Sequence, residues 1–236
     1  MPGPMSSPET ISPLPGSLPN LVLDEDQALA LLKSPDLAPD VLEQLSKNPA
    51  LLKSRKIKLG IVAHQKTPRY VSLALIRQLF TFDLMRVALM PTGLPDIKRA
   101  AEEVLINRIE TIALGAKVSL ARRASGRVAG QLLLDSEPRV FSAALQNPRL
   151  TEVAIVRVLM REDTTVSFVQ AVCRDPKWSL RREIRIALLL NEKTQMARAL
   201  EFARSLPARV VKETMQRSRL PANIKSYLLK DLASRS

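Results

Sequence analysis

The feature that most constrains the fold is a recurring break, in which a residue followed by proline interrupts apolar segments of helical length. Proline cannot continue a helix because it lacks the backbone N–H and its ring clashes with the preceding turn. The breaks are expected to leave helical stretches of about 10 to 15 residues in the C-terminal half, the usual length of a helix in a globular protein. They lie at Glu137-Pro138, Asn147-Pro148, Asp175-Pro176, Leu206-Pro207 and Leu220-Pro221. Many short helices are therefore predicted.

The composition favours helices over a β-sandwich or a barrel. Aromatic residues make up only 3% of the 236 residues, whereas strands draw on aromatic and β-branched side chains. Apolar residues account for 46% of the chain, enough to bury a sizeable core. Where Ile57, Leu59 and Ile61 alternate as in a strand, the helical neighbours favour a helix. An all-α fold is therefore predicted.

Four segments share one layout, a polar break of about four residues followed by the start of a helix. They are residues 34–45, 64–75, 147–159 and 191–203. The third of them is predicted to be the turn and second helix of one helical hairpin. Farther along, the helix in residues 178–190 is predicted to place its apolar side chains on one side, namely Leu180, Ile184, Ala187 and Leu188.

Threonines mark the expected starts of three of these helices. Thr67, Thr151 and Thr194 stand where an N-cap belongs, and Pro68 takes a favoured position in the first turn. With residue 38 as the first, the presumed caps are 29, 84 and 43 residues apart. A helix pair with its two turns takes about 35 to 45 residues, so the longer spacings match one or two pairs.

The Asn-Pro-x-Leu-Thr break at residues 147–151, followed by an amphipathic helix, resembles the leucine-rich repeat variant and HEAT-like families of bacterial helical repeat proteins. The resemblance covers about residues 30–70 and 136–230, and residues 92–135 lack the break. It implies a right-handed α-solenoid of stacked helical hairpins with a concave surface and no catalysis of its own. We predict one all-helical repeat-like domain over residues 21–236, after a disordered Pro- and Ser-rich tail at residues 1–20.

The residues that usually carry enzyme chemistry are scarce. His64 and Cys173 are the only residues of their types and share no local motif, so a zinc site and a nucleophilic triad lack their ligands and bases. Cys173 lies in an apolar helical pattern and is predicted to be a buried thiol. The chain has no GxGxxG or Walker A sequence. These observations predict a protein that is not an enzyme and uses no metal and no small-molecule cofactor.

The N-terminal sequence and the lengths of the apolar runs bear on localisation. The first residues have neither a positively charged region nor an apolar core of the kind found in signal peptides. No apolar run approaches the roughly 20 residues that a membrane span requires. We therefore expect a cytoplasmic protein that does not bind a membrane.

Charge is unevenly distributed along the chain. The formal net charge is +13, made up of −5 over residues 1–50 and +18 over residues 51–236. Residues Arg123 and Arg127, like Arg181 and Arg185, are four apart and share a helix face if their helices are continuous. The predicted partner-binding residues are Arg122, Arg123, Arg127, Arg181, Arg182, Arg185 and Lys212.

The small residues between positions 121 and 130 are expected to let helices approach closely.

Two kinds of partner fit such a basic surface, and the sequence leaves both open. The leading hypothesis is a non-catalytic helical-repeat scaffold that binds an acidic protein segment. The alternative is a protein that binds the phosphate backbone of a nucleic acid, with a possible relation to HEAT-like DNA glycosylases through Asp175, Trp178 and Arg181. Those enzymes gather such residues from separate helices, whereas here they are local, and Trp178 is expected in the core. A third interpretation is a solvated surface with no anionic partner. The oligomeric state is left open.

Overall fold

The computed structural model describes residues 23–235, which form helices and turns with no strand among them. The all-α prediction is thus confirmed, and the tail predicted at residues 1–20 lies outside the described residues. The helices are α1 (Glu25–Leu31), α2 (Pro39–Lys47), η1 (Leu51–Lys53), α3 (Arg55–Ala63), α4 (Arg69–Ile76), α5 (Thr81–Leu89), α6 (Pro95–Arg108), η2 (Ile109–Thr111), α7 (Leu114–Arg123), α8 (Gly126–Leu132), α9 (Pro138–Leu145), α10 (Glu152–Leu159), α11 (Val166–Arg174), α12 (Arg182–Leu190), α13 (Met196–Arg204), α14 (Ala208–Arg217) and α15 (Ala222–Ala233). Within residues 23–235, no helix is both long enough and apolar enough to cross a membrane.

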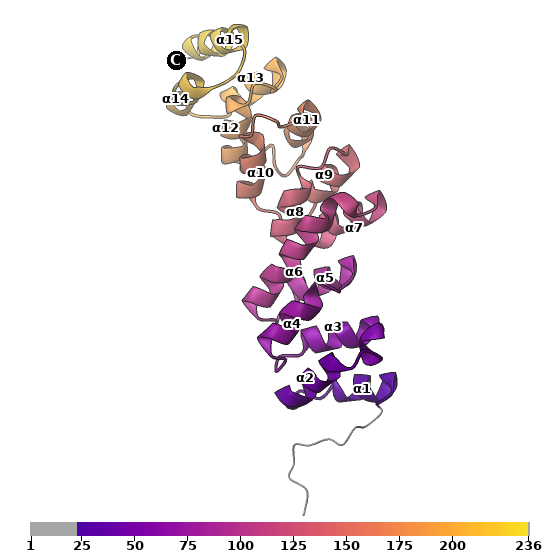
Figure 1. Cartoon of the computed structure of the whole chain (residues 1–236). Coiled ribbons are helices and arrows are strands. Elements are labelled where there is room, and N and C mark those ends of the chain that lie inside the picture. Colours follow the sequence, from indigo (N-terminus) through magenta and orange to yellow (C-terminus); the bar gives the residue numbers. More distant parts are fainter. Residues whose placement is uncertain (1–22, 236) are drawn as a thin grey trace, which may run out of the picture.

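Most helices pack against the helix two places along the chain. The even-numbered helices form one continuous series of contacts, from α4 through α6, α8, α10 and α12 to α14. The odd-numbered helices pack likewise in the groups α1, α3, α5, then α7, α9, α11, then α13, α15. Figure 1 shows the even-numbered helices along one side of an elongated stack and the odd-numbered helices along the other. We call these the even column and the odd column.

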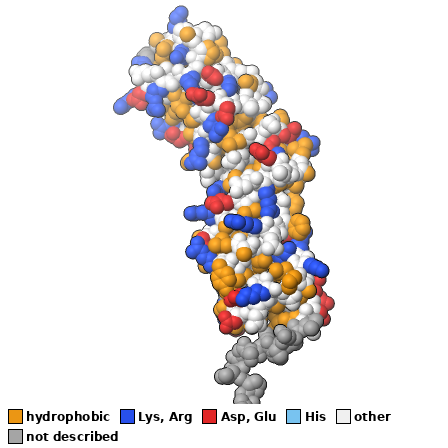
Figure 2. All heavy atoms as spheres, in the orientation of Figure 1, with side chains coloured by type: hydrophobic (Ala, Val, Ile, Leu, Met, Phe, Trp, Pro, Cys, Tyr) orange, Lys and Arg blue, Asp and Glu red, His pale blue; other side chains and the backbone are white. Residues whose placement is uncertain are grey.

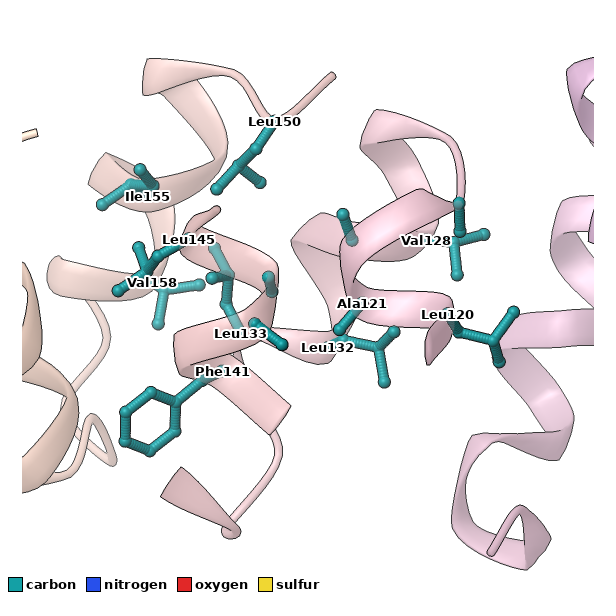
Figure 3. Packing of buried hydrophobic residues seen from close by; sticks show 14 of the residues in the cluster. Leu120, Ala121, Val128, Leu132, Leu133, Phe141, Leu145, Leu150, Ile155 and Val158 are labelled. Atoms are coloured by element: carbon teal, nitrogen blue, oxygen red, sulfur yellow. The ribbon is translucent and has the colours of Figure 1, made fainter. Parts of the chain in front are cut away.

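The core lies between the two columns. Helix α10 buries Ile155, Val158 and Leu159, and this spacing of three and four residues places them on one face. Figure 3 shows side chains from α7 to α10 directed into a common core. Helix α12 buries Ile184, Ala187 and Leu188 in the same way. The prediction for Leu180 was wrong, because α12 begins at Arg182 and leaves Leu180 in the preceding turn with 67% of its surface exposed.

Only one of the three predicted threonine caps is an N-cap. The Thr151 hydroxyl accepts a hydrogen bond from the Ala154 N–H (3.4 Å), as predicted. The prediction was wrong for Thr67 and Thr194, which stand one residue before the caps Pro68 and Gln195 and are buried. Each hydroxyl donates to the backbone carbonyl six residues earlier, that of Ile61 for Thr67 (2.5 Å) and that of Leu188 for Thr194 (2.6 Å). The hydroxyl therefore bonds a free carbonyl of the preceding helix and does not cap the helix that follows.

Four of the turns use one side-chain pattern. An Asn, Asp or His just after a helix accepts a hydrogen bond from the backbone N–H two residues later, which is the geometry of an Asx-turn. In each of these four turns the residue two positions later is a Lys or Arg, whereas Asn48 after α2 accepts the same kind of bond from the Ala50 N–H (3.0 Å). The pairs are His64 with Lys66 (3.2 Å), Asn147 with Arg149 (2.8 Å), Asp175 with Lys177 (2.9 Å) and Asn191 with Lys193 (2.9 Å). We call this pattern the Asx-x-cation turn.

The carbonyls at the ends of several helices are bonded by side chains from farther along the same column. No residue between 23 and 235 has a positive φ, so these helices do not end in the left-handed residue that commonly caps a helix. Side-chain donors at the end of a later helix, or in the turn after it, bond these free carbonyls instead. The bonds run from Asn147 to Ala121 (2.8 Å) and Ala124 (3.1 Å), from Asn191 to Leu159 (2.6 Å), from Trp178 to Leu145 (2.8 Å), from Ser218 to Leu189 (2.6 Å) and from Arg108 to Leu79 (2.8 Å). Each bond fixes one turn against an earlier one.

The small residues between positions 121 and 130 lie where neighbouring segments approach closely, as predicted. A Cβ atom at Gly126 would lie 2.3 Å from the Arg149 carbonyl oxygen, so a larger residue there would require the backbone to move. A Cβ atom at Gly130 would lie 3.3 Å from the Cβ of Ala154 on α10. The start of α8 therefore lies directly against the turn before α10.

Candidate polyanion-binding surface

The side chains that could bind a metal ion either form hydrogen bonds within the fold or lie apart from one another. In the part of the chain that the structure describes, no three His, Cys, Asp or Glu side chains gather in a way that would hold a metal ion. His64 uses both ring nitrogens in its turn, since Nε2 lies 2.9 Å from the Ser34 carbonyl oxygen and Nδ1 accepts from the Lys66 N–H. A cavity of about 420 Å³ lies beside His64, and its wall combines apolar side chains with the polar side chains of Gln65, Thr67, Ser72 and Thr92.

The thiol of Cys173 is buried in α11, as predicted, and its burial raises its pKa to about 11. We expect alkylation of the native protein by iodoacetamide at pH 8 to be at least about 100-fold slower than alkylation of the urea-unfolded chain, because the thiolate is the reactive form. Because the pKa of the thiol is higher in the folded than in the unfolded chain, the free energy of unfolding falls as the pH rises from the unfolded pKa towards 11. Equal rates of alkylation for the native and the unfolded chain would contradict the buried position of Cys173.

The turns that lead from an odd helix to the next even helix share one edge of the stack between α7 and α12. Asn147, after α9, bonds carbonyls at the end of α7. Gln146 donates to the Asp175 carboxylate after α11 (3.0 Å). These bonds bring together the ends of α7, α9 and α11. The turns that lead from an even helix to the next odd helix lie on the opposite edge. There Asn191 bonds the end of α10, and Lys193 donates to the Thr164 carbonyl (2.7 Å).

The two edges differ in charge. The first edge, residues 121–127, 145–152 and 174–183, has the acids Glu152, Asp175 and Glu183. We call this edge the basic edge. Its cations are all exposed and are Arg122, Arg123, Arg127, Arg149, Arg174, Lys177, Arg181 and Arg182. The opposite edge, residues 132–139, 159–167 and 190–197, carries three cations (Arg139, Arg161 and Lys193) and five acids (Asp135, Glu137, Glu162, Asp163 and Glu192). Positive charge is therefore concentrated on one edge of these hairpins.

Most cations of the basic edge lack an acidic partner. Within residues 23–235, Arg127 is the one member in an ion pair, with Glu102 (3.6 Å) and Glu103 (3.4 Å). The Arg123 guanidinium lies 6.0 Å from the centre of the Phe82 ring. Asp175 is buried, and its oxygens accept from Gln146 and from two backbone N–H groups, so it forms no ion pair with its neighbours. The other cations have no acidic partner among the described residues, and Arg149 donates to the Arg123 carbonyl (3.5 Å).

Five of the seven predicted binding residues lie on the basic edge, namely Arg122, Arg123, Arg127, Arg181 and Arg182. The other two lie about one turn into later even helices. Arg185 is half-buried on α12 and its Nε donates to the Ser179 carbonyl (2.8 Å), while Lys212 is exposed on α14.

The condition under which arginines four apart would share a helix face is not met, because neither helix is continuous. Arg123 ends α7 and Arg127 lies on α8, because the chain turns at Ala124 and Ser125. Arg181 is the N-cap of α12 and precedes the helix that carries Arg185. These cations share an edge because the turns are stacked.

Three cations of the basic edge were not among the predicted residues, namely Arg149, Arg174 and Lys177. Arg149 and Lys177 occupy the third position of Asx-x-cation turns, in Asn147-Pro148-Arg149 and Asp175-Pro176-Lys177. This repeated tripeptide is a signal that the sequence contains. Arg174 is the last residue of α11, and its place beside the other turns follows from packing.

The basic edge offers cations but no exposed aromatic ring among its turns. Trp178 is only 3% exposed, as predicted for a core residue, and its ring is covered by the Lys177 ammonium at 4.1 Å from the ring centre. Stacking on aromatic rings is how many proteins hold unpaired bases. The edge is therefore suited to contact with carboxylates or phosphates.

Over the molecule as a whole, charges of both signs are present. Figure 2 shows Lys and Arg side chains along the full length of the visible face, mixed with apolar side chains and with Asp and Glu. No protein-family model, curated protein or solved structure matches this chain, so its candidate site rests on its own geometry.

Proposed function

We propose that this chain is a non-catalytic helical-repeat scaffold that binds an acidic protein segment through the basic edge. Contacts between helices two places apart support an α-solenoid arrangement of the HEAT-like kind, with its hairpins joined by the carbonyl bonds of the turns. The right-handed superhelix implied by the resemblance stays a prediction. The buried free thiol of Cys173 fits a reducing compartment such as the cytoplasm.

The observation that carries the proposal is the row of cations without acidic partners on three consecutive hairpins. Neighbouring helices in such a stack lie about 8 to 10 Å apart, so the row from α7 to α11 extends over roughly 20 Å. An extended peptide rises about 3.3 Å per residue, so a segment of about six or more residues spans the row. Arginine binds a carboxylate through two parallel N–H groups, which favours acidic side chains as ligands.

The phosphate backbone of a nucleic acid is the second candidate, because the same guanidinium groups bind phosphates. The lack of an exposed ring on the edge favours backbone contact over recognition of bases. We do not extend the proposal to glycosylase activity. Asp175 closes a turn with its carboxylate, and Trp178 is buried, so both side chains are committed to the fold.

Fluorescence anisotropy distinguishes the two partners. We expect a labelled 15-residue peptide rich in Glu and Asp to bind the full chain, and its affinity to weaken about tenfold or more between 50 and 200 mM salt because the contacts are electrostatic. A single-stranded oligonucleotide of the same length serves as the second ligand. Stronger binding of the oligonucleotide, with a steep salt dependence, would favour the second candidate. Absence of binding to both ligands at 50 mM salt would overturn the proposal.

A further inference from the structure

The two ends of the stack carry opposite charge. Helices α1 and α2 lie at one end in Figure 1, and α14 and α15 lie at the other. Residues 23–50 contain six acids (Asp24, Glu25, Asp26, Asp36, Asp40 and Glu43) and two lysines (Lys33 and Lys47). Residues 205–235 contain seven cations (Arg209, Lys212, Arg217, Arg219, Lys225, Lys230 and Arg235) and two acids (Glu213 and Asp231). We call these regions the acidic end and the basic end.

Several charges at each end have no ionic partner among the described residues. At the acidic end, Glu43 pairs with Lys47 and Asp36 with Lys66, whereas Asp26 and Asp40 are exposed and unpaired. At the basic end, Asp231 is held by Arg204 and Arg235, at 2.6 and 2.9 Å. Glu213 is paired with Arg209 (2.9 Å). Lys212, Arg217 and Lys230 are exposed without an acidic partner.

Each end also exposes apolar surface. Tyr227 and Leu229 on α15 are 44% and 42% exposed, beside Lys230. At the acidic end, Pro35, Ala38 and Pro39 are exposed next to Asp40. In a stack of repeats each unit packs against its neighbours, so the outer faces of the terminal helices have no neighbouring repeat among the described residues.

We infer that the chain associates head to tail, with the acidic end of one copy docking on the basic end of a second copy. An acidic face that meets a basic face makes a heterologous contact, and such a contact propagates into rows unless the rotation between copies closes a ring. The partner is a second copy because each end supplies the charge that the other lacks. This inference does not depend on the proposed function.

Charge reversal tests the inference. We expect sedimentation velocity of the nuclease-treated full chain at 50 mM salt to show species that grow with concentration, and their dissociation at 500 mM salt, because salt screens exposed charges. Two variants each invert the net charge of one end. Asp26→Lys, Asp36→Lys, Asp40→Lys and Glu43→Lys together change the acidic end from −4 to +4, and Lys212→Glu, Arg217→Glu, Lys225→Glu and Lys230→Glu together change the basic end from +5 to −3. Each variant alone should associate at least about tenfold more weakly, because like charges then face each other at the contact.

Two mixed experiments separate charge complementarity from loss of folding. A chain with all eight substitutions again has ends of opposite sign and should associate about as strongly as the original chain. An equimolar mixture of the two single-end variants should also associate, because one has two basic ends and the other two acidic ends. Failure of both to restore association, or a chain that stays monomeric at every concentration at 50 mM salt, would overturn the inference. Association that the reversals leave unchanged would do the same.

Discussion

Replacing Asn147 with alanine is expected to lower the free energy of unfolding by about 3 kcal/mol, because it leaves buried polar groups without partners. The side chain is fully buried and donates to the carbonyls of Ala121 and Ala124. Its oxygen accepts from the Arg149 N–H. The substitution removes three hydrogen bonds at the place where α9 is joined to α7.

Asn48 provides a matched control. It also precedes a proline, and its side chain accepts from the N–H groups of Ala50 (3.0 Å) and Leu51 (3.4 Å) within its own turn. Among the residues that the structure describes, it makes no bond to an earlier turn. Asn48→Ala should therefore cost no more than about 1 kcal/mol. Urea unfolding followed by circular dichroism measures both. Equal losses in the two variants would show that the bond between turns does not stabilise the stack.

Reversing three cations of the basic edge is expected to weaken binding of the acidic peptide about 100-fold, which corresponds to about 2.7 kcal/mol. The substitutions are Arg123→Glu, Arg149→Glu and Arg181→Glu, one in each consecutive turn. An exposed ion pair contributes at most about 1 kcal/mol, and reversal replaces each attraction with repulsion. Binding is measured by anisotropy at 50 mM salt, after circular dichroism has shown that the helices are retained.

The control for this variant changes the net charge by the same amount elsewhere. Lys56, Arg86 and Arg139 are exposed and have no ion pair within residues 23–235, and they lie on α3, α5 and the opposite edge. Their reversal to glutamate should weaken binding less than about fivefold if contact is local, because the remaining effect acts through the overall field. Similar losses in both variants would mean that net charge governs binding and the basic edge has no special role.

Much of the secondary structure could be predicted from the sequence because its causes are local. Each predicted proline break separates two helices: Pro148 and Pro176 follow the ends of α9 and α11, whereas Pro138, Pro207 and Pro221 stand at the starts of α9, α14 and α15. Residues 55–63 form the helix that was favoured over a strand. Apolar spacing placed Ile184, Ala187 and Leu188 in the core. Thr67 and Thr194 were misplaced because a hydroxyl can bond forwards to an N–H or backwards to a carbonyl, and the chain's path through the turn decides between them.

The candidate site was only partly predictable for a different reason. Arg122 and Arg123 are more than fifty residues from Arg181 and Arg182, so their common edge depends on how hairpins stack. The sequence alone determined that the chain is all-helical, where many of its helices break, and that it has an excess of cations, because proline, periodicity and charge act within a few residues. The tertiary structure alone decided that Arg174 joins those arginines and that Arg185 does not. That outcome follows from buried bonds between turns, such as those of Asn147, which bring distant segments to one edge.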